Sequence, residues 1–121
     1  MPEKILIVDD EPMLVSLLSD YLSDLGYFTC TAADGKEALD KLRFSPDLIL
    51  LDISMPELSG VEAIPRIREV APGARILIVS MHATAGHVRA ALKAGADGYL
   101  LKTADEDEFL VAIRALLKGR K

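Results

Sequence analysis

The chain has 121 residues, a length that accommodates one domain with a single hydrophobic core. Hydrophobic residues make up 50% of it and charged residues 27%, which is typical of a globular protein and excludes an intrinsically disordered one. The formal net charge of -5 argues against nucleic-acid binding by this chain, because phosphate contacts depend on clustered Lys and Arg.

Cysteine content and the length of the apolar runs bear on the compartment. The single cysteine, Cys30, cannot form an internal disulfide and lies in a strand-like run, as a core or half-buried residue does. The first apolar run, Ile5–Val8, is too short for the core of a signal peptide, and no run approaches transmembrane length. We therefore expect a cytoplasmic protein without a membrane partner.

Five short apolar runs predict β-strands. The third, Leu48–Leu51, has four aliphatic residues with no polar alternation, as in a strand that is covered on both faces of a parallel sheet. It is followed at once by Asp52 and then by Pro56. The predicted strands are Lys4–Val8, Tyr27–Ala32, Leu48–Leu51, Ala74–Ser80 and Gly98–Lys102.

Amphipathic segments between these runs predict helices. The first helix begins at Pro12, whose missing N–H suits the first helical position, and ends at Gly26. Asp34 and Glu37 form a capping-box-like start to the second helix.

The last three helices have less regular starts. Pro65 predicts either that the third helix begins later than Gly60 or that it kinks at the proline. The fourth, Thr84–Ala94, has few large apolar residues, so we expect it to be the most loosely packed. Thr103 with Glu106 predicts the cap of the fifth.

Strands and helices alternate five times, with short links and without a tandem repeat. This order predicts an α/β fold in which helices cover both faces of a parallel sheet. We expect one domain over residues 1–121, with any further domain beyond residue 121.

Polar residues end four of the predicted strands. They are Asp9 and Asp10 after the first strand, Asp52 after the third, Ser80 after the fourth and Lys102 after the fifth. Parallel strands all point the same way, so these residues should meet at one edge of the sheet. Taken singly, each has an ordinary alternative as a turn, cap or strand-end residue.

Three carboxylates at one edge repel each other unless cations lie among them. Lys102 supplies one positive charge, and a hard divalent ion with oxygen ligands would supply the rest; Mg²⁺ fits better than a Ca²⁺ cage because it uses few protein carboxylates. A carboxylate beside Mg²⁺, a hydroxyl and an ammonium are the groups that phosphoryl transfer needs. The glycine-rich loops that bind nucleotides are absent from the sequence, so a nucleotide is not the expected phosphoryl donor.

Four segments together resemble the receiver domain of bacterial response regulators. They are Val8–Pro12, Leu51–Pro56, Val79–His82 and Ala94–Lys102, and the likeness spans essentially the whole chain. The resemblance implies a flavodoxin-like (βα)5 fold with strand order 2-1-3-4-5. It also implies a two-component signalling function in which the domain catalyses only its own phosphoryl transfer and dephosphorylation and is not otherwise an enzyme.

The resemblance assigns a role to each residue of the constellation. It implies that Asp52 accepts the phosphoryl group from a sensor histidine kinase and that Lys102 pairs with that group. Mg²⁺ would be bound by Asp9, Asp10, Asp52 and the backbone carbonyl of Ser54. Ser80 would be the switch hydroxyl, and Tyr99 would be the switch aromatic, although a half-buried strand tyrosine is the plain alternative.

In this interpretation phosphorylation shifts a two-state equilibrium that alters the face formed by the fourth helix, the fifth strand and the fifth helix. Expected partners are the histidine kinase, an output domain on the same or a separate chain, and a second copy in a homodimer. The output would be transcription.

Three further features concern the subclass of receiver domain, the peptide bond after Lys102 and the lifetime of the phosphoryl group. The segments around Ser80 and Tyr99 resemble the subclass joined to a LuxR/NarL-type helix-turn-helix domain. Thr103 follows the lysine where many receivers have proline, so a cis peptide there would cost about 2.5–4 kcal/mol and is not assumed. Ser54 and His82 occupy positions that tune phosphoryl lifetime in the family; for His82 an exposed loop residue without a special role is the alternative.

Two other functions remain open at this point. One is a small phosphatase with an aspartate nucleophile, although the haloacid dehalogenase type would want Asp at the position of Ser54. The other is a pseudo-receiver that binds a partner without phosphorylation, against which the joint presence of Asp52, Ser80 and Lys102 argues.

Overall fold

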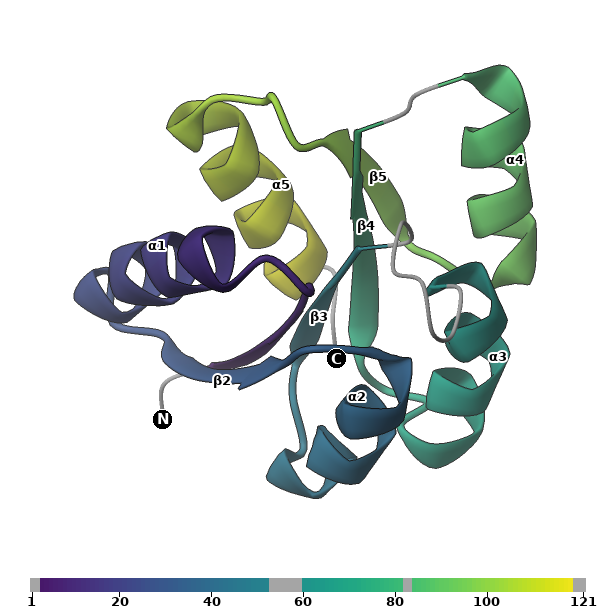
Figure 1. Ribbon diagram of the computed structural model, residues 1–121, viewed down its shortest axis with the longest axis horizontal. Coiled ribbons are helices and arrows are strands. Elements are labelled where there is room, and N and C mark those ends of the chain that lie inside the picture. The colour runs from purple at the N-terminus through teal and green to yellow at the C-terminus, as the bar shows by residue number, and fades with distance from the viewer. Residues whose placement is uncertain (1–2, 53–59, 82–83, 119–121) are drawn as a thin grey trace.

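The computed structural model describes residues 3–52, 60–81 and 84–118, and omits the side chains of residues 60–62. Five parallel strands form one sheet in the order β2-β1-β3-β4-β5 (Figure 1). The strands are β1 (Lys4–Val8), β2 (Phe28–Ala32), β3 (Leu48–Asp52), β4 (Arg75–Ser80) and β5 (Gly98–Leu101). This is the predicted flavodoxin-like topology.

Each strand is followed by an α-helix, and the five helices cover both faces of the sheet, with α1 and α5 on one face and α2, α3 and α4 on the other (Figure 1). They are α1 (Pro12–Asp24), α2 (Gly35–Lys41), α3 (Gly60–Val70), α4 (Ala85–Ala94) and α5 (Glu106–Lys118), with a 3-10 turn η1 (Leu42–Phe44) after α2. Within the described part of the chain, no helix has both the length and the apolar character needed to span a bilayer.

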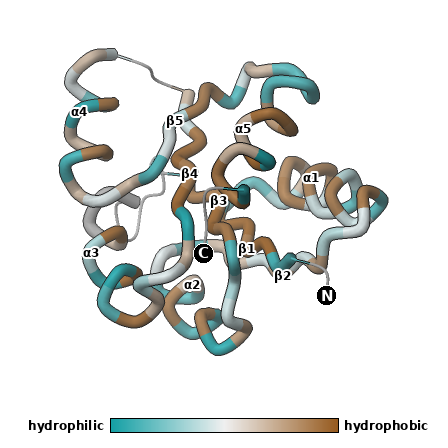
Figure 2. Tube along the Cα trace, turned by 180° about the vertical axis from the view of Figure 1, so that it is seen from behind, coloured by the Kyte–Doolittle hydropathy of each residue, from teal (hydrophilic) through white to brown (hydrophobic). Residues whose placement is uncertain are grey.

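Side-chain alternation along the strands divides the core into two layers. Leu6, Ile49 and Ile76 pack with α2, α3 and α4, whereas Ile7 and Leu50 pack with α1 and α5. All five residues of β3 are buried, as the uninterrupted apolar run predicts. Figure 2 shows this hydrophobic colouring concentrated in the central strands. The rigid centre of the sheet therefore ends at Asp52.

The structure corrects the predicted cap of α5 and excludes one of the two alternatives for α3. Thr103 and Glu106 do not form the cap of α5; Asp105 does, accepting a hydrogen bond from the Glu108 N–H at 2.8 Å, because a turn after β5 delays the helix. For α3, the alternative of a start later than Gly60 is excluded, since the helix begins at Gly60 and contains Pro65.

Three other expectations agree with the structure. The Asp34 side chain accepts from the Glu37 N–H at 2.7 Å, as the capping-box pattern predicts. Helix α4 buries only Ala91, which agrees with its sparse apolar content. The peptide between Lys102 and Thr103 is trans.

A polar cluster of Asp97, Arg68 and Arg75 stabilises the amino end of the sheet, opposite the strand ends that carry the acids. Asp97, just before β5, accepts hydrogen bonds from the Ile76 N–H at 2.8 Å and from the side chains of Arg68 and Arg75. The Arg68 guanidinium also donates to the carbonyl of Gly95. Gly95 ends α4 with a φ of 119°, a left-handed conformation that favours glycine. The cluster thus joins α3, β4, α4 and β5.

Replacing Asp97 tests this cluster. Burial raises the pKa of Asp97, but the Ile76 N–H and Arg68 outweigh burial and hold the pKa below its usual value. Its stabilisation is therefore present above the unfolded pKa of about 3.9 and is lost as pH falls through the lower folded pKa. We expect Asp97→Asn to reduce the free energy of unfolding by about 1–2 kcal/mol at pH 7. The difference in stability between the two proteins should become smaller below about pH 4. Urea denaturation measures both, and equal stability at pH 7 would contradict the role.

Candidate functional site

The acids of the site lie where β1 and β3 end. Asp9 directly follows β1 and Asp52 is the last residue of β3. Because the two strands are paired in parallel, with Val8 opposite Leu51, their following residues are neighbours at one edge of the sheet. Both carboxylates are buried, with Asp9 5% and Asp52 2% exposed. Asp10, the next residue along, is exposed.

These three carboxylates form a cluster with the geometry of a cation site. Asp9, Asp10 and Asp52 each offer an oxygen, and the three oxygens lie within 4.8 Å of one another. Hard oxygen donors at this spacing suit a small divalent cation that keeps several of its waters. The convergence expected from the sequence is therefore present for all three acids, and the donor set fits the expected ion.

Lys102 provides the positive charge of the site. It follows β5, and its backbone N–H donates to the Ser80 carbonyl at 2.8 Å, which continues the ladder past the end of the strand. Its side chain is 7% exposed, and its Nζ lies 3.0 Å from Asp9 Oδ2 and 3.2 Å from Asp52 Oδ2. An ammonium at this place compensates both buried carboxylates at once.

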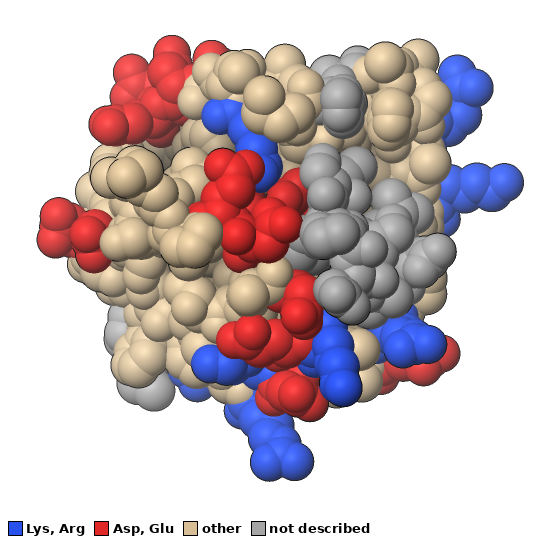
Figure 3. Space-filling model, in the orientation of Figure 1, with Lys and Arg blue, Asp and Glu red and all other residues tan. Residues whose placement is uncertain are grey.

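The third partner of Lys102 is Glu11, whose Oε1 lies 2.9 Å from Nζ. In the sequence Glu11 is only the acid before Pro12, where the first helix begins. It is the N-cap of α1, but its side chain makes no capping hydrogen bond and reaches Lys102 instead. Its place directly after Asp9 and Asp10 was the one signal that could have identified it. In Figure 3 acidic side chains gather near the centre of this face, with basic side chains at their upper edge.

The pKa values of Asp9 and Lys102 shift upward for different reasons. Burial raises the pKa of Asp9, and the charge of Asp52 adds to this, against the opposing hydrogen bonds from Lys102 and the Glu11 N–H. Burial lowers the pKa of Lys102, but its hydrogen bonds to Glu11 and Asp9 and the charge of Asp52 outweigh burial and raise that pKa well above its usual range. Lys102 is therefore protonated at neutral pH, whereas ionisation of Asp9 is costly.

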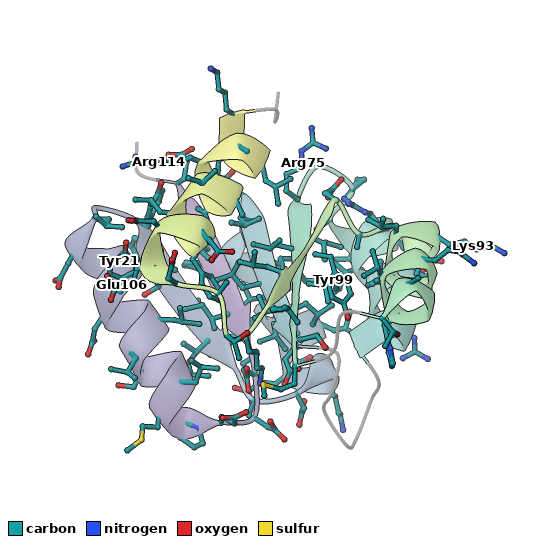
Figure 4. The ribbon with its side chains drawn as sticks, turned by 90° about the horizontal axis from the view of Figure 1, so that it is seen from above. Tyr21, Arg75, Lys93, Tyr99, Glu106 and Arg114 are labelled. Carbon is teal, nitrogen blue, oxygen red and sulfur yellow. The ribbon has the colours of Figure 1, made fainter. Side chains whose placement is uncertain are left out.

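Ser80 lies next to this cluster at the end of β4, whereas Tyr99 lies on β5 opposite Ile78. Ser80 is the last residue of β4 and is fully buried; in register it is one residue beyond Val79, which is opposite Asp52. Tyr99 is half-buried and packs on the core layer covered by α2, α3 and α4, and Figure 4 shows it between β5 and α4. Ser54 and His82, the other two residues predicted for this site, lie outside the described residues.

Comparison with known proteins agrees with this geometry. The sequence model of the response regulator receiver domain family matches residues 5–114 of this chain. The chemotaxis protein CheY of Thermotoga maritima is 32% identical over 120 residues, covering 98% of this chain and 100% of that protein. The nitrate/nitrite response regulator protein NarL of Escherichia coli K12 is 36% identical over 121 residues, covering 98% of this chain and 56% of NarL. The chain spans about half the length of several other curated relatives.

Solved structures give the same result. A two-component response regulator of the LuxR family from Aurantimonas sp. SI85-9A1 superposes with a TM-score of 0.90 at 35% identity, covering 100% of this chain and 89% of that one. The response regulator protein TrrA from Thermotoga maritima, in complex with Mg²⁺-BeF, gives a TM-score of 0.81 at 38% identity, covering 94% and 98% of the two chains. The fold, the acidic site and the matched sequence together show that this chain belongs to the response regulator receiver domain family, whose members are phosphoacceptors rather than conventional enzymes.

Proposed function

We propose that this chain receives a phosphoryl group on Asp52 from a sensor histidine kinase and uses it to switch an output. One observation carries the proposal: the buried Asp52 carboxylate lies at the end of the central strand, 3.2 Å from the Lys102 ammonium and within the cluster of three acids. The proposed working compartment is the cytoplasm.

The chemistry requires few residues. An Asp52 oxygen attacks the phosphorus of the kinase's phosphohistidine, so that the new O–P bond replaces the N–P bond and the imidazole leaves. Lys102 donates N–H bonds to the transferred phosphoryl oxygens, and its raised pKa keeps it charged for this task. Asp9, Asp10, Asp52 and the Ser54 carbonyl would hold Mg²⁺, which when bound supplies positive charge to the phosphoryl oxygens. The TrrA complex with Mg²⁺-BeF supports this choice of ion.

The proposed switch connects Asp52 to the face formed by α4, β5 and α5. The Ser80 hydroxyl would bond to the phosphoryl group and draw the end of β4 toward it, and Tyr99 would change its position in response. A depression of about 400 Å³ already lies on this face, so a moved side chain has room; it is lined by Val88, Tyr99, Leu100, Leu101, Thr103, Ala104 and Glu108. With Ala91 as its only buried residue, α4 is held by little packing.

The output is proposed to be transcription through a LuxR/NarL-type helix-turn-helix domain, on this or a separate chain, with a homodimer as the active form. The similarity to NarL and to the Aurantimonas LuxR-family regulator supports this subclass. Because the similarity extends equally to the chemotaxis protein CheY, a separate output partner is the alternative. Ser54 and His82 are proposed to tune the lifetime of the phosphoryl group.

Incubation with a small acyl phosphate and Mg²⁺ tests the acceptor. We expect the intact mass to increase by one phosphoryl group, and the increase to be absent from Asp52→Asn. Asp40→Asn, which changes an exposed acid of α2, is the matched control and should still be phosphorylated. No increase in the unsubstituted protein would contradict the proposal, and rapid hydrolysis of unrelated phosphoesters would favour the phosphatase.

Amide chemical shifts test the switch. Addition of beryllofluoride and Mg²⁺, which mimic the phosphorylated state, should shift the NMR signals of Val88, Tyr99 and Leu101. Ser80→Ala should reduce these shifts while leaving phosphorylation of Asp52 measurable by mass, because the hydroxyl transmits the signal and does not accept the group. Full shifts in Ser80→Ala would show that this hydroxyl is not the connection.

Removing the Asp9 charge tests the metal site. Because the folded pKa of Asp9 is raised, its contribution to stability is complete below the unfolded pKa of about 3.9 and is lost as pH rises through the folded value. Without metal, Asp9→Asn should therefore increase Tm by roughly 2–5 °C at pH 7 and have little effect at pH 4. It should also weaken Mg²⁺ binding, since a ligand is lost. Calorimetry measures both, and a lower Tm with unchanged Mg²⁺ affinity would contradict the assignment.

A further inference from the structure

The side chain of Glu11 differs from the other acids around Lys102 in its exposure. It is 60% exposed, whereas the side chains of Asp9 and Asp52 are 5% and 1% exposed. Glu11 is also absent from the three acids whose oxygens lie at cation-binding distance. It therefore holds the ammonium from the solvent side, outside the proposed metal site.

The hydrogen-bonding capacity of Lys102 is fully used in this arrangement. An ammonium has three N–H donors, and three carboxylate oxygens lie between 2.9 and 3.2 Å from Nζ. Two of those oxygens belong to Asp9 and Asp52, which the proposed metal site also needs. A divalent cation and the ammonium carry charge of the same sign, so they compete for these two carboxylates.

Glu11 is connected to the same cluster through its backbone. Its N–H donates to Asp9 Oδ1 at 3.0 Å, and Pro12 follows it as the first residue of α1. The backbone of Glu11 therefore orients Asp9 while its side chain holds Lys102. A change from Glu to Gln weakens only the second of these functions, because the negative charge is lost while the backbone N–H is kept.

We propose that Glu11 is a positioning residue. Its carboxylate stays paired with the Lys102 ammonium when a divalent cation binds at Asp9, Asp10 and Asp52. Lys102 then releases the two buried carboxylates to the metal without losing every partner. Glu11 thereby raises the affinity for Mg²⁺ through Lys102, although it is not itself a ligand. The inference rests on the metal site of the proposed function but not on phosphorylation.

A double-mutant cycle tests this role by calorimetric titration with Mg²⁺, without any phosphoryl donor. The proteins are the unsubstituted chain, Glu11→Gln, Lys102→Met and the double variant. An exposed ion pair contributes about 0.2–1 kcal/mol, so Glu11→Gln should weaken Mg²⁺ binding by up to about fivefold when Lys102 is present. In the Lys102→Met background the same change should weaken it at most slightly. Equal losses in both backgrounds would show a direct charge effect and overturn the inference.

Glu106→Gln is the matched control for charge. Glu106 is an exposed acid in the first turn of α5 that lines the same groove as Lys102. Its replacement should leave the Mg²⁺ affinity within the error of the unsubstituted chain. A loss as large as that of Glu11→Gln would assign the effect to net charge and overturn the inference.

NMR of the lysine ammonium supplies a second readout that does not require Lys102→Met to fold. The Nζ–H hydrogens of Lys102, observed through ¹⁵N, should remain protected from solvent exchange after Mg²⁺ is added to the unsubstituted chain. In Glu11→Gln this protection should be lost when Mg²⁺ is added. Protection in both proteins would overturn the inference. Failure of the unsubstituted chain to bind Mg²⁺ would overturn both this inference and the proposed metal site, whereas failure of phosphorylation alone would leave this inference standing.

Discussion

The arrangement of this site depends on one ammonium placed among three carboxylates. Lys102 lies within 3.2 Å of Asp9, Glu11 and Asp52, two of which are almost completely buried. Without a cation there, two buried negative charges at adjacent strand ends would destabilise the fold, because neither could be hydrated. The charge on Lys102 therefore allows the protein to keep the Asp52 carboxylate buried at the edge of the sheet.

The sheet makes this placement rigid. Its central strand is buried along its full length and ends in Asp52, and the parallel pairing fixes Asp9 and Ser80 beside it. Helices on both faces hold the strands, so the distances at the edge depend on packing throughout the domain. By contrast, the helix proposed to respond to phosphorylation, α4, buries a single alanine. A rigidly held acidic site and a sparsely packed helix are thus combined in one small domain.

The two ends of the sheet are organised differently. At the carboxyl ends, acids outnumber the ammonium, and the pKa of Asp9 is raised by burial. At the amino ends, Asp97 receives hydrogen bonds from Ile76, Arg68 and Arg75, and its pKa is lowered. The first arrangement leaves unbalanced negative charge that a divalent cation could compensate, whereas the second is satisfied internally. Function and stability are therefore separated along the strand direction.

The sequence by itself determined the alternation of strands and helices, the buried central strand and the acids at the strand ends, because these depend on local periodicity and on parallel pairing. Only the tertiary structure decided that Asp105 rather than Thr103 caps α5, that α3 includes Pro65, and that Glu11 pairs with Lys102. Glu11 and Lys102 are 91 residues apart, so no local pattern records their contact. Parallel pairing brings the strand ends together, so the acids and Lys102 were predictable as neighbours, whereas the Glu11 side chain meets Lys102 only in the assembled fold.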